Sequence, residues 1–452
     1  MEQEEILELI DKKDFQSLKK ILSDMLVPDV AIILQEIEEP ANAVRIFRLL
    51  PKTMGAEVFG YIEEDLQEIL VNYMTDKELA FIMEELYTDD AVDFIEEMPA
   101  TVVERALKIA SPETRSVINK FLSYEENTAG AIMTSEFLDV TEEMTVKQAL
   151  NRVKKIARDV PTINCLFVTD AKRILRGVVS IKDFILADPK KKIKSIMDDN
   201  IVFTHTNTDQ EEVAMTFQKY DVLVLPVVDN ENRLVGMVTA DDVMEVIEEE
   251  ATKDIHQMAG VVSNDKPYLK TNVFKTFLYR LPWLLILMLS ATFTGIIINA
   301  YEGTLNSLSP LLFACVPMLM GTGGNAGSQT SVTIIRGISL NEIEFKQIFS
   351  VLWKEIRISI MVAACLGVAC FAKLQLIDRL LLGYNYTELV SLAVSIALFA
   401  TIVIAKLVGC ILPLVAKKCK LDPAVMASPF ITTIVDVLSL IIFCNVSIYL
   451  LG

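Results

Sequence analysis

The stretch MASPFITTIVDVLSLIIFCNVSIYLLG, residues 426–452, closes the chain and decides its class. It is long enough to cross a bilayer as a helix, since about 20 apolar residues suffice. Asp436 is the one acidic residue within it. A carboxylate at bilayer depth costs several kcal/mol unless it faces water, a partner or a passing cation, so it indicates a functional site. The stretch therefore predicts a membrane protein that moves a cation.

Four further apolar segments precede this one. They cover residues 281–300, 303–335, about 348–372 and about 389–416. The segment 303–335 carries no charge and is long enough to span a membrane with a break or bend. The sequence therefore predicts five spans, which place the two termini on opposite faces.

Basic residues cluster at the boundaries of these segments, and such clusters mark the cytoplasmic face. The clusters are Lys266, Lys270, Lys275 and Arg280; Arg336, Lys346, Lys354 and Arg357; and Lys417, Lys418 and Lys420. With all three inside, the N-terminus is cytoplasmic and Gly452 lies outside. We expect a multi-pass protein of the cell membrane.

Charge separates the two halves of the chain. Residues 1–270 hold 53 of the 61 acidic and 30 of the 42 basic side chains, a net charge of about −23. Such a surface repels nucleic acid and attracts divalent cations. The first residues, MEQEEILELIDKK, lack the basic flank and apolar core of a signal peptide, so we expect this half to stay in the cytoplasm. The seven cysteines lack metal-ligand spacing, and we expect them to be reduced and structural.

Residues 1 to about 125 have the sequence pattern of a helical domain. Apolar residues recur at intervals of three and four, and signals such as Pro51 and Pro99 interrupt them about every 15 residues. This pattern predicts stacked helical hairpins in an α-solenoid-like domain.

Residues 130–250 contain an internal duplication. The stretches around Met133 and Met197 match each other. The strand-like runs NCLFVTD and LVLPVVD are followed by RILRGVVSIKDFI and RLVGMVTADDVM, which align Gly177 with Gly236. The two copies resemble a tandem cystathionine-β-synthase (CBS) regulatory pair, an α/β fold.

Each copy ends in a hydroxyl residue followed three positions later by an acid. Ser180 and Asp183, and Thr239 and Asp242, match the motif by which CBS pairs often hold a nucleotide ribose. The same spacing is an ordinary helix N-cap. Both interpretations stay open, with ATP as the expected nucleotide.

The order of an acidic helical domain, a CBS pair and five spans resembles the MgtE family of magnesium transporters and channels. After Pro317, the stretch MLMGTGGNAGSQTSVTIIRG is similar to the family's glycine-rich break, and DPAVMASPFITTIVDV is similar to its last-span signature. The resemblance implies an N domain over 1–128, CBS domains over 129–250, a connecting (plug) helix over 251–275 and a five-helix transmembrane domain over 276–452. It also implies a homodimer whose pore, on the twofold axis, opens when cytosolic magnesium is low and closes when it is high.

The residues of these stretches suit magnesium independently of the resemblance. Mg²⁺ prefers octahedral oxygen ligands and keeps much of its water shell. The candidate pore ligands are Asp436 for charge, and Asn325, Thr432, Thr433 and the backbone carbonyls near Gly323 and Gly324 for neutral oxygens. A dimer would bring two copies of Asp436 to one axis, which neutralises one divalent ion.

Each pore assignment has a structural alternative. The glycines of residues 321–327 can instead permit close helix packing. Asp436 can instead pair with Lys406, which lies deeper than snorkelling from the helix end readily explains. Ser439 and Ser428 depart from the family pattern, which puts the pore geometry in question more than cation transport.

The resemblance further implies regulatory magnesium sites on the cytoplasmic side. The matching acids are Glu57, Asp89 and Asp93 in the helical domain, and Asp209, Glu211, Asp221, Asp242, Glu245, Glu250 and Asp254 in the CBS region. Bound magnesium would draw the domains together and hold the connecting helix closed, whereas without it the like charges repel. Lys253 lies inside the last group, and a solvated acidic face is the alternative interpretation.

Three classes of function follow. We expect a magnesium transporter gated by cytosolic magnesium, and not an enzyme. The alternative is a coupled secondary transporter of another divalent cation, such as cobalt or nickel, with nucleotide-sensing CBS domains. An intramembrane metalloprotease would need an HExxH pair, and the two histidines, His205 and His256, are far apart in the sequence.

Overall fold

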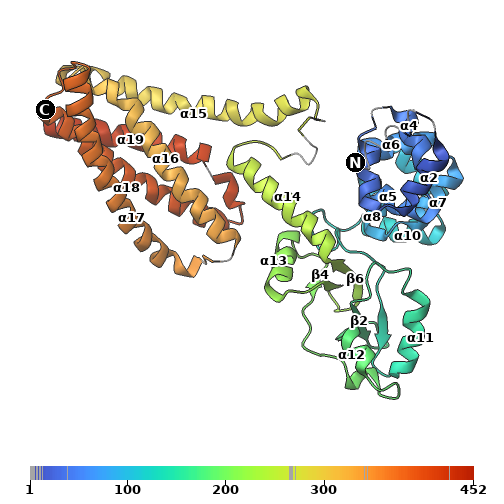
Figure 1. Cartoon of the computed structure of the whole chain (residues 1–452). Coiled ribbons are helices and arrows are strands. Elements are labelled where there is room, and N and C mark those ends of the chain that lie inside the picture. The colour runs from blue at the N-terminus through green and yellow to red at the C-terminus, as the bar shows by residue number, and fades with distance from the viewer. Residues whose placement is uncertain are drawn as a thin grey trace. The chain divides into compact units, whose positions relative to one another are not determined.

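The computed structural model describes residues 6, 9, 12, 14–37, 39–263, 268–269, 271–340, 342–343, 345–426 and 428–452. Lys266, Lys270 and the side chain of Ser428, named above, lie outside the described residues. The chain divides into two compact units, Met1–Ile247 and Glu248–Gly452. Figure 1 shows short helices and small sheets in the first unit and long helices in the second.

The first part of unit 1 is entirely helical within its described residues. Its helices are α2 (Phe15–Asp24), α3 (Val27–Gln35), α4 (Pro40–Phe47), α5 (Lys52–Tyr61), α6 (Glu64–Tyr73), α7 (Asp76–Glu85), α8 (Thr88–Glu97), α9 (Ala100–Ile109) and α10 (Pro112–Phe121). Pro51 and Pro99 are the N-caps of α5 and α9, and Thr75 closes a capping box with Glu78 at the start of α7. Helices pack on the helix two places along, as α3 on α5, α5 on α7 and α7 on α9. The predicted helical domain is confirmed.

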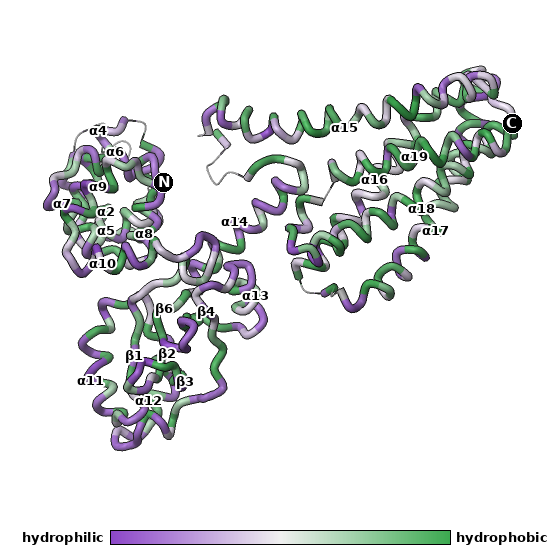
Figure 2. Tube along the Cα trace, turned by 180° about the vertical axis from the view of Figure 1, so that it is seen from behind, coloured by the Kyte–Doolittle hydropathy of each residue, from purple (hydrophilic) through white to green (hydrophobic). Residues whose placement is uncertain are grey.

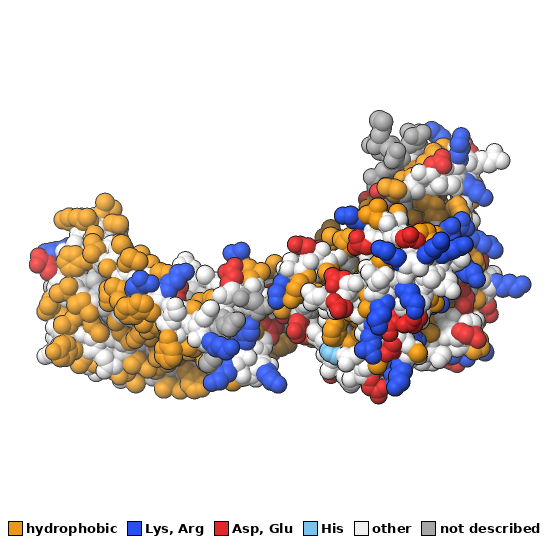
Figure 3. Space-filling view, turned by 90° about the horizontal axis from the view of Figure 1, so that it is seen from below, with side chains coloured by type: hydrophobic (Ala, Val, Ile, Leu, Met, Phe, Trp, Pro, Cys, Tyr) orange, Lys and Arg blue, Asp and Glu red, His pale blue; other side chains and the backbone are white. Residues whose placement is uncertain are grey.

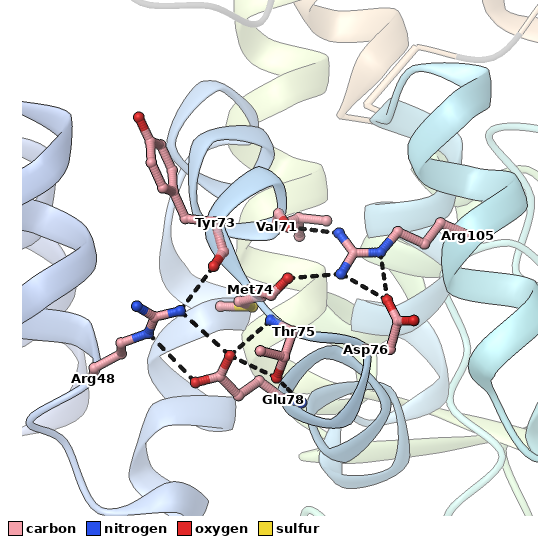
Figure 4. Close-up of polar contacts among 8 residues, drawn as sticks. All are labelled: Arg48, Val71, Tyr73, Met74, Thr75, Asp76, Glu78 and Arg105. Atoms are coloured by element: carbon pink, nitrogen blue, oxygen red, sulfur yellow. Dashed lines mark hydrogen bonds and ion pairs between the residues drawn. The ribbon is translucent and has the colours of Figure 1, made fainter.

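Two arginines fix the end of α6, where backbone carbonyls have no partner within the helix. Arg105 donates to the carbonyl oxygens of Val71 and Met74 at 2.9 and 2.7 Å, and pairs with Asp76 at 2.9 Å. Arg48 donates to the Tyr73 carbonyl at 2.8 Å. Figure 4 shows both guanidinium groups converging on the α6–α7 turn from different helices. These contacts set the stacking of the helices by polar groups as well as by the apolar core.

The second part of unit 1 contains two three-stranded sheets of the same design. One has the order β1 (Asp139–Thr141), β2 (Cys165–Thr169), β3 (Leu175–Ser180), and the other β4 (Thr204–His205), β5 (Val224–Val228), β6 (Leu234–Thr239). In each sheet the first pair is parallel and the second antiparallel. The accompanying helices are α11 (Val146–Ile156), α12 (Ile181–Leu186), the short 3-10 turn Ile193–Ser195, α13 (Gln210–Tyr220) and α14 (Ala240–Met258). The predicted duplication and the α/β CBS pair are confirmed.

The residues that align between the copies also meet in space. A Cβ atom on Gly236 would lie 2.6 Å from the sulfur of Met133, and one on Gly177 would lie 2.8 Å from the sulfur of Met197. The methionine that precedes each copy therefore packs on the glycine strand of the other. Glycine is required at both positions because a side chain would displace the methionine.

Unit 2 consists of long helices. They are α15 (Val273–Leu308), α16 (Leu312–Ser339), α17 (Ile348–Ala372) with its π-helical extension (Lys373–Leu381), α18 (Glu388–Lys418) and α19 (Ser428–Leu451), with 3-10 turns at Phe345–Gln347 and Pro423–Met426. Four stretches are long and apolar enough to cross a membrane: Val273–Leu308, Ile348–Leu381, Glu388–Lys418 and Pro429–Leu451. Figure 2 shows α15 as mainly hydrophobic and α16 as mixed. Figure 3 shows hydrophobic side chains spread over the visible face of unit 2, while charged ones gather mainly on unit 1.

Two expectations about the connections were wrong. The glycine-rich stretch of α16 does not break the helix, which runs unbroken from Leu312 to Ser339 because its carbonyls keep their helical partners. The neighbouring helices are also long, since α15 continues to Leu308 and the π-helical extension of α17 continues to Leu381. The helix over the connecting segment starts within the CBS region at Ala240 and ends at Met258, well before residue 275.

The chain that follows α14 is held against α15. Gly260 has φ +69°, and a Cβ there would lie 2.1 Å from the indole ring of Trp283. The backbone N–H of Val262 donates to the Tyr279 carbonyl at 3.2 Å. Only glycine allows both the left-handed backbone and the close approach of the indole.

Candidate functional site

The two stretches that carry the family resemblance pack against each other. A Cβ on Gly324 would lie 3.0 Å from Cγ2 of Thr432, and one on Gly327 would lie 2.8 Å from Cγ2 of Ile431. Gly323 faces Thr401 of α18 together with Val435 and Ser439 of α19. These glycines are buried, so they allow α16 to approach its neighbours closely. Packing is thus their observed role, and an unbroken helix leaves the Gly323 and Gly324 carbonyls less free than the sequence suggested.

The crossing of α16 and α18 is tighter still. A Cβ on Gly409 would lie 2.2 Å from the carbonyl oxygen of Gly327. The neighbour is backbone, which cannot rotate away as a side chain can. Two glycines from distant parts of the sequence therefore determine this crossing.

One face of α16 stays exposed and polar. Gly321, Asn325, Gln329 and Thr333 follow one another at intervals of four, and all four are exposed. Residues four apart share a helix face. Asn325 thus lies on a polar stripe that no other part of unit 2 covers within the described residues.

Asp436 is half-buried on α19, one turn beyond Thr432. Within the described part of the chain it forms no hydrogen bond and no ion pair. The hydroxyls of Thr432 and Thr433 donate to the Pro429 carbonyl at 2.9 and 3.1 Å, which leaves lone pairs on both oxygens. Thr433 also lies 3.4 Å from the hydroxyl of Ser290 on α15. This part of α19 combines one carboxylate with neutral oxygens.

Lys406 does not pair with Asp436 in this structure. Its side chain is buried on α18, and its ammonium donates to the hydroxyl of Thr330 on α16 at 3.2 Å. The alternative explanation of Asp436 as the partner of Lys406 therefore lacks support.

The acids of α8 lie close to acids of the CBS region. Burial raises the pKa of Asp89 well above its usual value, and the Asp242 carboxylate raises it further. Burial and then Asp242, Glu245 and Asp241 raise the pKa of Asp90 to about 6. Burial and then Asp90 raise the pKa of Asp93 to about 7, although its side chain is exposed, whereas those of Asp89 and Asp90 are partly buried.

A hydrogen-bonded contact joins α8 to the CBS region. The backbone N–H of Thr88 donates to the Glu136 carboxylate at 3.2 Å, and the Thr88 hydroxyl donates to the same group at 2.7 Å. The structure thus brings Asp89, Asp93, Asp242 and Glu245 together. Asp90 and Glu136 were missed; Asp90 had a visible signal, since it directly follows Asp89 in an acidic helix start.

The other predicted acids are more scattered. Glu57 is exposed on α5, and Asp209 and Glu211 are exposed at the start of α13. Asp221 caps the opposite end of that helix, about 16 Å away by helical rise. Glu250 pairs with Lys253 at 3.0 Å. Among the described residues, no group of three or more Asp, Glu, His or Cys side chains is arranged to hold a metal ion.

Asp254 on α14 lies near Asp422, an acid that was not among the predicted site residues. Burial raises its pKa to about 6, and the nearby carboxylates of Asp422 and Glu250 contribute. Asp422 lies in the connection between α18 and α19, where it accepts the Ala424 backbone N–H at 2.8 Å. It opens the signature stretch that ends near Asp436, so its position in the sequence was a usable signal. The connecting helix and the segment that leads into α19 therefore bear carboxylates that repel each other.

The candidate nucleotide residues are hydrogen-bonded to each other within each pair. The Ser180 hydroxyl donates to the Asp183 carboxylate at 2.7 Å and accepts the Asp183 N–H at 3.1 Å, so Ser180 is the N-cap of α12. The hydroxyl and the backbone N–H of Thr239 donate to the Asp242 carboxylate at 2.5 and 3.2 Å. All seven cysteines are free thiols.

Models of three protein families match the chain. The MgtE model, described as a divalent cation transporter, matches residues 316–446. The model of the MgtE intracellular N domain matches residues 25–127, and that of the CBS domain matches residues 129–190 and 193–249. The matches follow the order of domains in the structure.

Relatives of the chain cover almost its whole length. The magnesium transporter MgtE of Thermus thermophilus is 34% identical over 448 residues, which cover 98% of this chain and 97% of that protein. The magnesium transporter MgtE of Bacillus subtilis is 30% identical, over 96% of this chain and 93% of that protein. A solved structure of the cytosolic domain of the Mg²⁺ channel MgtE in complex with ATP is 36% identical. It covers 53% of this chain and 98% of its own, with a TM-score of 0.51. The soluble part of a magnesium transporter is 30% identical, covers 55% of this chain and 98% of its own, and has a TM-score of 0.52.

Proposed function

Because the chain belongs to the MgtE family, we propose that it transports Mg²⁺ across the cell membrane through a pore that α16 and α19 line. The observation that carries this proposal is Asp436, a half-buried carboxylate without a counter-charge among the described residues. The exposed stripe with Asn325 and the oxygens of Thr432 and Thr433 supply neutral ligands. One carboxylate and several neutral oxygens suit an ion that keeps much of its water. The family is described as a transporter and not as an enzyme.

We propose that α15–α19 are five spans, with a cytoplasmic N-terminus and Gly452 outside. Four of these helices are apolar enough by themselves. The remaining one, α16, is rich in glycine and hydroxyl residues, and α18 and α19 shield much of it. Its exposed polar stripe supports a homodimer, since a second copy across a twofold axis would enclose the stripe and bring two Asp436 carboxylates together. The alternate stacking of α3–α10 similarly supports a solenoid-like N domain.

Reconstituted protein tests the transport proposal. In liposomes with an imposed voltage and no sodium or proton gradient, we expect Mg²⁺ influx that saturates with ion concentration. Flux that appears only with a sodium or proton gradient would favour the coupled carrier. A higher flux of cobalt or nickel than of magnesium would favour a transporter of one of those ions. No Mg²⁺ flux under any of these conditions would contradict the proposal.

We propose that Mg²⁺ regulates this pore from the cytoplasmic side at two places. One is the acidic cluster of Asp89, Asp93, Asp242 and Glu245, with Asp90 added, and the other includes Asp254, Glu250 and Asp422. When the domains move, these regulatory sites would also include four further acids: Glu57, Asp209, Glu211 and Asp221. The close like charges support this, because a divalent ion between them relieves their repulsion.

We also propose that ATP binds the CBS pair. The hydrogen bonds within each hydroxyl–acid pair would then break, and the ribose would bind to these four side chains: Ser180, Asp183, Thr239 and Asp242.

Charge reversal at Asp254 is expected to close the pore permanently. Lysine there would attract Asp422 and hold α14 in place as bound Mg²⁺ does, so Asp254→Lys should give low flux even at low cytoplasmic-side Mg²⁺. The double variant Asp254→Lys/Asp422→Lys restores repulsion, and we expect high flux that Mg²⁺ no longer inhibits. Glu302→Gln, an exposed acid on α15, serves as the control. If Asp254→Lys were inhibited by Mg²⁺ like the parent, the regulatory role of this pair would be wrong.

The acidic cluster should also make the soluble half sensitive to pH. The folded-state pKa values of Asp89 and Asp90 are raised, so their stabilising contribution is full below about pH 3.8 and is lost as pH rises through about 6 and above. In the presence of a chelator we expect the calorimetric unfolding temperature of this half to fall between pH 5 and pH 8. Millimolar Mg²⁺ should restore it at pH 8 and change little at pH 5. Asp89→Asn/Asp90→Asn should flatten the profile and Asp24→Asn should not; a profile unchanged in the double variant would contradict this assignment.

A further inference from the structure

Two charged side chains of opposite sign are buried in unit 2 away from the proposed pore ligands. Lys406 on α18 is 6% exposed, and Glu355 on α17 is 8% exposed. The ammonium of Lys406 uses one of its three donors, toward Thr330. Among the residues that the structure describes, no hydrogen bond or ion pair engages Glu355. An uncompensated charge buried in a membrane protein is strongly unfavourable, so each of the two requires an opposite charge.

The fold brings Glu355 close to the helix that carries Lys406. Glu355 is close enough to the Cys410 thiol to interact with it electrostatically, and Lys406 precedes Cys410 by one helical turn on the same helix. Cys410 packs in a cluster to which α16 contributes Ile334 and Ile338, and α17 contributes Val351 and Leu352.

Lys406 starts deeper in the bundle than the groups that it is proposed to contact. By helical rise, Glu355 lies about 10 Å from the start of α17, Thr330 about 13 Å from the end of α16, and Lys406 about 18 Å from the end of α18, so the pairing uses the length of the lysine side chain. These three helix ends meet in the Cys410 cluster, so the distances run from one end of the bundle.

We propose that Lys406 and Glu355 compensate each other as a buried charge pair, and that this pair positions the pore helix α16 through Thr330. The inference rests on the proposed pore function of α16. The Thr330 hydroxyl accepts from Lys406 and donates to the Ala326 carbonyl at 3.3 Å. Ala326 directly follows Asn325, so the contact reaches the turn that carries the proposed ligand. Lys406 is then a positioning residue and not a counter-ion of Asp436.

Thermal unfolding of the purified full chain tests the pairing independently of transport. Lys406→Met and Glu355→Gln each leave one buried charge alone, and we expect each to lower the unfolding midpoint by roughly 5–10 °C. The double variant removes both charges and should return close to the parent. The matched controls Lys354→Met and Glu388→Gln alter exposed charges on the same two helices and should change little. If the losses of the two single variants simply add in the double variant, the pairing is wrong.

Flux measurements test the positioning role. The folded double variant should carry several-fold less Mg²⁺ at saturating ion, with the half-saturating concentration unchanged, because Thr330 has lost its donor. Thr330→Val should reproduce this loss while both charges remain. Parent-like flux in both variants would overturn the positioning role. A parent that carries no Mg²⁺ would contradict the proposed function instead, and the unfolding series would still decide the pairing.

Discussion

Replacing Asp436 by asparagine is expected to reduce Mg²⁺ flux into proteoliposomes to the level of protein-free vesicles. Asparagine keeps the size and the hydrogen-bonding oxygen but removes the negative charge that offsets the cost of bringing a divalent ion to bilayer depth. The fold should survive, since the carboxylate has no hydrogen bond or ion pair in the described structure. Asp436→Glu, which retains the charge, should keep part of the flux. Isotope uptake or a fluorescent Mg²⁺ indicator inside the vesicles provides the measurement.

The control for this prediction is Glu388→Gln, which removes an exposed acid at the start of α18. Its flux should equal that of the parent. A folded Asp436→Asn protein with parent-like flux would overturn the pore assignment. Recovery of flux in Asp436→Asn/Lys406→Met would instead support the pairing of Asp436 with Lys406, which the Lys406 contact with Thr330 argues against.

Gly409→Ala should strongly destabilise the packing of α16 against α18. The new Cβ would lie 2.2 Å from the Gly327 carbonyl oxygen, so α16 and α18 must separate. Overpacking typically costs about 1–3 kcal/mol, and we expect the upper end of that range here because backbone has to move. We expect a clear fall in the unfolding midpoint in detergent and a loss of flux, because α16 carries Asn325.

Gly303→Ala is the matched control for this helix crossing. Its Cβ would meet no described atom within 4 Å, and alanine is favoured over glycine within a helix by about 1 kcal/mol. The variant should be as stable as the parent or slightly more stable. Equal stability of Gly409→Ala and Gly303→Ala would show that the crossing is looser than the structure indicates.

The domain order and the CBS duplication could be predicted from the sequence because their signals are local or repeated. Matching stretches around Met133 and Met197 gave the two copies, and the predicted glycine alignment has a physical cause in the reciprocal packing of Met197 on Gly177. Proline signals such as Pro51 likewise mark helix starts, since proline ends one helix and fits the first turn of the next.

The helix of the glycine-rich stretch could not be predicted in the same way. Glycine has a low intrinsic helix propensity, so Gly321–Gly327 suggested a break. Tertiary contacts outweigh that propensity, because α18 and α19 approach these glycines too closely for any side chain. Asp422 and Glu355 were missed for a related reason: their importance comes from neighbours far away in the sequence, Asp254 and Lys406.

Gly260 determines how closely the chain that follows α14 approaches α15. The chain after α14 is held against α15 at two points. The indole of Trp283 lies against the Gly260 backbone, and the N–H of Val262 donates to the Tyr279 carbonyl. Any larger side chain at position 260 would therefore separate the chain that follows α14 from the Trp283 part of α15.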